Sequence, residues 1–261
     1  DGTKLAVAEM IRSGTTCFND MYFFSDNTAE VCVNIGMRVV IGLIVIDLPT
    51  SWASNSDEYL TKGEFIHDTF KHNPLISTAF APHAPYTVSD DSLKRIAVLA
   101  EELDIPIHMH IHETSDEIEQ SINQYGKRPL ERLSDLGLLS SRLIAVHMTQ
   151  LEQNEIDEIK KTRVSVVHCP ESNLKLASGF CPVGKLQKNN INVCIGTDGA
   201  ASNNDLDMLG EMHITALLAK GVNNDCACSD AHTTLRMATL NGAKALGMSE
   251  SIGSLKKGKQ A

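Results

Sequence analysis

The sequence has no apolar run of the length needed to cross a membrane, and we find no signal-peptide pattern at its start. Basic residues are also scarce, because 23 Lys and Arg stand against 33 Asp and Glu, for a formal net charge of −10. The one basic block is the tail at residues 256–259. Binding to nucleic-acid phosphates needs a basic face. We therefore expect neither a membrane nor a nucleic-acid partner.

Paired cysteine motifs are missing as well. The seven cysteines are odd in number and scattered, and several lie in apolar patterns. Cys226 and Cys228 are too close together for a zinc knuckle, and no second pair accompanies them. These features predict a reduced, cytoplasmic protein.

Apolar strand patterns and helical patterns alternate along the 261 residues, of which 42% are hydrophobic. One helix comes first, and a strand followed by a helix then recurs seven times. The expected strands cover residues 15–21, 38–47, 75–81, 106–112, 143–148, 164–168 and 193–196. Alternation of this kind builds either an open doubly wound sheet or a closed barrel.

Polar residues at the ends of the expected strands favour the barrel. Nearly every strand ends in one, as the active-site loops of a barrel require; these residues are Asp20, Asp47, His83, Glu113, His147, His168 and Asp198. No glycine-rich phosphate turn comes after the first strand, so a dinucleotide-binding fold lacks its fingerprint. We predict one domain over residues 1–261: an incomplete (β/α)8 TIM-type barrel. Eight strands are needed and seven are found, so we expect the first strand to be missing.

Histidines alternate with apolar residues in the strand expected at 106–112. A period of two places His108, His110 and His112 on one face, and Glu113 comes directly after them. A buried ladder of hydrogen-bonded rings is one explanation. Metal binding beside an acid/base carboxylate is the interpretation we prefer for so many imidazoles.

Asp198 comes after the last expected strand, in the stretch 195–200. Alone it could be a turn residue or a helix cap. Other strand ends carry His110, Glu113 and His147, and imidazole and carboxylate together suit a hard or borderline metal. We expect His168 and Asn173 on a loop at the same mouth, where they either contact substrate or brace the loop.

Five motifs carry a family resemblance. They are PHAPYT at 82–87, HIHET at 110–114, AVHMT at 145–149, HCPESNLKL at 168–176 and GTDGAASNN at 196–204. On these motifs the chain resembles the amidohydrolase superfamily, and within it the 5′-methylthioadenosine/S-adenosylhomocysteine deaminases. The resemblance implies a metal-dependent hydrolytic deaminase that converts an adenine nucleoside to its inosine analogue and ammonia.

The resemblance also implies roles for single residues. His110 would be a metal ligand, and Asp198 both a metal ligand and the base that takes a proton from the attacking water. Glu113 would carry protons to the purine ring nitrogen and the leaving amine. His147 would orient the water, and His83 would contact the substrate together with Glu113 and Asp198.

One divalent metal is implied, with zinc first and iron or manganese as alternatives, because the strand at 75–81 has no lysine to bridge a second metal. His110 and Asp198 are two of four expected ligands, since the family's first-strand His-x-His pair is absent, as is its small β-sandwich. We therefore expect a fragment, with its metal weakly held or missing. The resemblance places His108 deeper in the core and His112 at a variable position.

Two other functions stay open. The same barrel could deaminate guanine, cytosine or a triazine, or it could be a fragment without catalytic activity. In the leading interpretation the partner is a small nucleoside, and homo-oligomerisation is left open.

Overall fold

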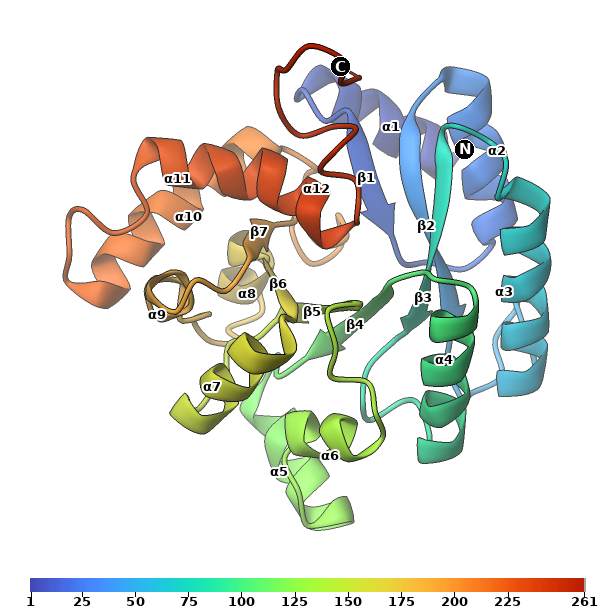
Figure 1. Cartoon of the computed structure of the whole chain (residues 1–261), viewed down its shortest axis with the longest axis horizontal. Helices are drawn as coiled ribbons and strands as arrows, with labels where there is room; N and C mark the ends of the chain where they lie inside the picture. Colours follow the sequence, from blue (N-terminus) through green and yellow to red (C-terminus); the bar gives the residue numbers. More distant parts are fainter. Residues whose placement is uncertain (261) are drawn as a thin grey trace.

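Strands and helices alternate along the chain in the computed structural model, which describes residues 1–260 (Figure 1). Within these residues seven strands form one parallel sheet in the order β1 to β7. They are β1 (Cys17–Asp20), β2 (Arg38–Val45), β3 (Ile76–Pro82), β4 (Ile107–Ile111), β5 (Leu143–His147), β6 (Ser165–His168) and β7 (Val193–Ile195). The order never reverses, as it would in a doubly wound sheet. The prediction of seven strands in barrel order is confirmed.

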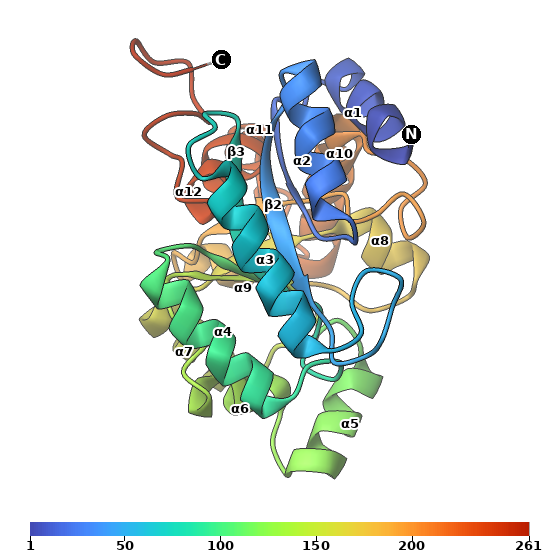
Figure 2. The same ribbon diagram turned by 90° about the vertical axis from the view of Figure 1, so that its right-hand side faces the viewer.

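Helices lie along the outer side of the curled sheet, and Figure 2 shows α2 and α3 running beside β2. The helices are α1 (Gly2–Arg12), α2 (Ser25–Ile35), α3 (Ser56–Phe70), α4 (Asp90–Glu102), α5 (Ser115–Tyr125), α6 (Pro129–Asp135), α7 (Gln153–Thr162), α8 (Pro170–Lys175), α9 (Val183–Lys188), α10 (Met208–Asn223), α11 (Ala231–Arg236) and α12 (Gly242–Ala245), with a π-helix, η1 (Met237–Asn241), between the last two. In the described part of the chain, none is both long and apolar enough to span a membrane.

Side-chain caps fix where several helices begin. Asn55, Ser89 and Thr114 each accept a hydrogen bond from a backbone N–H in the first turn of α3, α4 and α5. Such caps are worth about 1 kcal/mol each, because they satisfy N–H groups that have no partner inside the helix. Ser89 is followed by Asp90 and Asp91, a sequence that predicts a helix N-cap, and this cap is confirmed. The cap at Thr114 makes α5 start directly behind the loop that carries Glu113.

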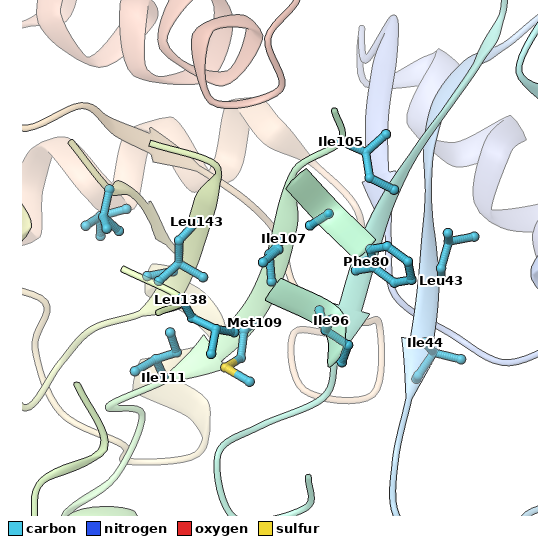
Figure 3. Close-up of a cluster of buried hydrophobic side chains, with 14 of the residues drawn as sticks. Leu43, Ile44, Phe80, Ile96, Ile105, Ile107, Met109, Ile111, Leu138 and Leu143 are labelled. Atoms are coloured by element: carbon cyan, nitrogen blue, oxygen red, sulfur yellow. The ribbon is translucent and has the colours of Figure 1, made fainter. Parts of the chain in front are cut away.

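The core lies between the sheet and the helices (Figure 3). Phe80 of β3 and Met109 of β4 are fully buried there, and Ile96 of α4 packs from the helical layer. Burying a side chain of this size stabilises the fold by about 1.5–3 kcal/mol. The outward-facing residues of each strand are thus held in the core, which leaves the inward-facing ones to line the interior.

Candidate active site

The carboxyl ends of four strands bring the predicted site residues together. The ring of His110 lies 5.2 Å from that of His83 and 5.3 Å from that of His147, measured between centroids. Glu113 comes after β4, and its Oε2 atom is 3.7 Å from Nε2 of His147. Asp198 comes after β7, and its charge acts on all three imidazoles. Residues spread over more than a hundred positions of sequence thus share one mouth.

A backbone carbonyl fixes the orientation of His110. Its Nδ1–H donates to the carbonyl oxygen of His83 at 2.8 Å, so the lone pair is on Nε2. Burial lowers the pKa of the ring, and the imidazole is neutral at pH 7. A neutral imidazole whose second nitrogen donates to a carbonyl is the form that ligates metals.

His147 has the opposite arrangement. Its Nδ1 accepts a hydrogen bond from the amide nitrogen of Asn173 at 3.0 Å, so the ring proton is on Nε2, the atom that faces Glu113. Burial lowers its pKa to about 4. His147 is therefore a neutral hydrogen-bond donor on the site side of the ring. The expectation that His168 and Asn173 lie on a loop was wrong, because His168 is the last residue of β6 and Asn173 lies in α8.

Asp198 is held as a carboxylate by two hydroxyl groups. Its Oδ2 accepts from Ser172 at 2.7 Å and from Ser202 at 2.6 Å. Burial opposes ionisation, but these hydrogen bonds outweigh it and hold the pKa of Asp198 below its ordinary value. Sequence reasoning did not single out Ser172 or Ser202, although both lie inside motifs that carry the family resemblance. Their hydroxyls leave Oδ1 as the less occupied oxygen.

The expectation that three histidines share one face was wrong for His112. β4 ends at Ile111, and His112 has a φ of +55°, so the alternation stops before it. Its Nε2 accepts the backbone N–H of Leu130 at 3.2 Å and lies 3.6 Å from Glu155. His112 is thus buried among helices α6 and α7, as its variable position in the resemblance had suggested.

His108 does face the interior, but below the site. Its Nδ1 accepts from the amide nitrogen of Asn19 on β1 at 2.8 Å. Burial lowers its pKa to about 3, and its ring centroid lies 6.0 Å from that of His110. His168 is buried as well, with Nδ1 unpartnered.

The chain's residues suit a metal in kind but supply only part of a coordination shell. His110 offers a neutral nitrogen with a free lone pair, and Asp198 offers an ionised oxygen. Zinc sites have four ligands, three of them from protein in catalytic sites. Among residues 1–260 no group of three or more His, Cys, Asp or Glu side chains is placed to hold a metal ion.

Comparison with known proteins shows the family of the chain. The whole chain, residues 1–261, matches the Amidohydrolase family. It is 53% identical over its full length to a 5-methylthioadenosine/S-adenosylhomocysteine deaminase of Saccharophagus degradans and covers 58% of that protein. It is 43% identical over 260 residues to a 5'-deoxyadenosine deaminase of Methanosphaera stadtmanae, of which it covers 61%.

A solved structure gives the same result in three dimensions. An adenosine deaminase from Xanthomonas campestris with bound zinc matches all of this chain with a TM-score of 0.98 and 58% identity, and the match covers 59% of that chain. The chain thus spans about three fifths of the length of the relatives it matches. Match over the entire sequence, together with this overlay, shows that the chain belongs to the amidohydrolase family.

Proposed function

We propose that this chain carries the proton-transfer residues of a metal-dependent deaminase that acts on adenine nucleosides. The main support for this proposal is that Glu113, Asp198 and the Nε2–H of His147 lie together at the carboxyl ends of the strands. Relatives named for methylthioadenosine, adenosylhomocysteine and 5'-deoxyadenosine support a 5′-modified nucleoside as the substrate. The net reaction consumes one water and gives the inosine analogue and ammonia.

The role of a metal in this proposal rests on His110 and Asp198. Zinc is the first choice, because the Xanthomonas campestris structure is described with bound zinc, and His110 Nε2 and an Asp198 oxygen would be its ligands from this chain. When bound, a divalent metal lowers the pKa of a coordinated water to about 7.

Each remaining step belongs to a residue of the chain. Asp198 takes a proton from the attacking water, and the Nε2–H of His147 donates a hydrogen bond that orients it. The water supplies both protons that the reaction needs: the one that Asp198 takes, and a second that the added hydroxyl loses as the product carbonyl forms. Glu113 passes one to the ring nitrogen beside the attacked carbon and the other to the departing amine, which leaves as ammonia. His83, whose Nδ1 lies 3.1 Å from the hydroxyl of Thr87, contacts the purine. Burial lowers the pKa of His83 to about 4, so it does so as a neutral ring.

The test compares Glu113→Gln with Asp198→Asn and His83→Ala in the longest natural chain that contains residues 1–261. Glu113→Gln keeps the shape of the side chain but carries no acidic proton, so kcat should fall by about 10²–10⁴-fold while zinc content stays unchanged. Asp198→Asn should lose both zinc and rate. His83→Ala should raise KM with a smaller change in kcat.

Zinc analysis and steady-state kinetics on 5′-methylthioadenosine measure these effects. Near-normal kcat in Glu113→Gln would refute the proposal. So would loss of zinc from His83→Ala, since that result would make His83 a ligand.

A further inference from the structure

Glu117 is a buried carboxylate outside the set of residues that act on substrate. It lies in the first turn of α5 and is 5% exposed. Its Oε1 accepts the backbone N–H of His112 at 2.9 Å, and its Oε2 accepts the N–H of Glu113 at 2.8 Å. Two oxygens of one carboxylate thus hold two successive amides of the loop that carries the proposed proton carrier.

Thr149 holds the backbone carbonyl group of Glu113. Its hydroxyl donates to the carbonyl oxygen of Glu113 at 2.7 Å. Thr149 lies two residues beyond His147, where β5 ends. The backbone of Glu113 is therefore fixed on its N–H side by α5 and on its C=O side by the β5 loop.

Capping of α5 does not explain the two hydrogen bonds that Glu117 accepts. Thr114 already caps the helix, because its hydroxyl accepts the N–H of Glu117 at 3.2 Å. In a capping box, a glutamate three residues after the cap would accept the backbone N–H of the cap residue, here Thr114. Glu117 instead reaches past the cap to the two residues before it, which lie at the site.

We propose that Glu117 and Thr149 are positioning residues that clamp the backbone of Glu113 and so aim its carboxylate at the reacting atoms. The proposal rests on Glu113 being the proton carrier of the proposed function. The side chain of Glu113 has few restraints of its own: Oε1 accepts from Ser178 at 3.2 Å, and Oε2 lies 3.7 Å from His147. Its aim must come from the backbone.

The clamp predicts a specific pattern of kinetics. Glu117→Gln replaces one acceptor oxygen with an NH₂ group that meets a backbone N–H, and Thr149→Val removes the hydroxyl. Each should lower kcat by on the order of 10–10²-fold, since displacement of a catalytic group by about 1 Å can cost 10²-fold. KM and zinc content should stay near the wild-type values, because neither residue is placed against substrate or metal.

Three variants complete the experiment. Thr149→Ser keeps the donor and should restore kcat. Glu119→Gln removes an exposed carboxylate from the same helix and should leave kcat unchanged. Glu113→Gln tests the proposed function separately: if it is active, that function fails, and the clamp has nothing to aim.

Hydrogen exchange supplies a readout that needs no substrate. In Glu117→Gln the amides of residues 112 and 113 should exchange faster, and those late in α5 should not. The clamp is overturned if Glu113→Gln is inactive while Glu117→Gln and Thr149→Val lower Tm but keep kcat. If Glu117→Gln does not fold, Thr149→Val against Thr149→Ser decides: equal kcat in the two overturns the proposal.

Discussion

Gly42 occupies a place in β2 where the neighbouring backbone leaves no room for a side chain. A Cβ built on it would lie 2.2 Å from the carbonyl oxygen of Asp20 on β1 and 3.0 Å from Cβ of Ala81 on β3. An ordinary carbon–oxygen contact is about 3.3 Å, so Gly42→Ala must move β1 by about 1 Å. The obstacle is backbone, which cannot rotate away as a long side chain can.

We expect Gly42→Ala to cost about 3 kcal/mol, at the upper end of the range for overpacking. For a chain of this size that cost lowers Tm by roughly 6–12 °C. Scanning calorimetry or circular dichroism at 222 nm would measure the shift. The matched control is Gly221→Ala in α10, where an added Cβ meets nothing within 4 Å. Alanine favours a helix over glycine by about 1 kcal/mol, so the control should keep or raise Tm. A Gly42→Ala protein that melts within about 1 °C of wild type would refute the steric reasoning.

Two further predictions concern polar groups around the site. Asn173→Asp places a carboxylate beside Nδ1 of His147, which should draw the ring proton from Nε2 to Nδ1. We expect kcat to fall by about 10-fold or more without loss of zinc. An unchanged kcat would show that the tautomer of His147 does not matter for catalysis. Burial raises the pKa of Glu211, which accepts from Asn203, from 4.5 to about 8. Because the folded state binds this proton more tightly, its contribution to stability is complete below pH 4.5 and is lost as the pH rises through 8. Tm of Glu211→Gln relative to wild type should therefore rise between about pH 5 and about pH 9, and a constant difference would contradict the shifted pKa.

Local pattern is enough to predict much of the fold. The apolar run at residues 38–47 predicts β2, and Ser89 followed by two aspartates predicts the start of α4, each from a few consecutive residues. Helix α8 was missed because Pro170 and Glu171 open it directly after β6, without the loop that a proline after a strand suggests. The pattern of residues 230–246 predicts one helix, but η1 interrupts it, and the sequence carries no breaker inside Met237–Asn241.

The site divides in the same way. Polar residues at strand ends could be expected to meet because barrel geometry gathers them. Alternation along β4 placed His108 and His110 on the inner face, but only the family resemblance distinguished His110 from His108. Alternation also predicted His112 wrongly, since a single left-handed residue ends it. Glu117 was not recognised, and Asn173 was left between two roles, because their partners are backbone amides and a ring that only the folded chain brings near. Such contacts depend on loop conformation, which the helix and strand periodicities of a sequence do not predict.

The order of the strands has a consequence for how the chain folds. Within residues 1–260 each strand pairs only with the strands directly before and after it in sequence. Cys17 pairs with Arg38, 21 residues away, and Val39 pairs with Ile76, 37 residues away. Closure of each such loop costs less entropy than pairing the same strand with a more distant one. An early pair needs nothing from later parts of the sequence, so the sheet can grow on the ribosome one strand at a time, each new strand joining an edge that has already formed.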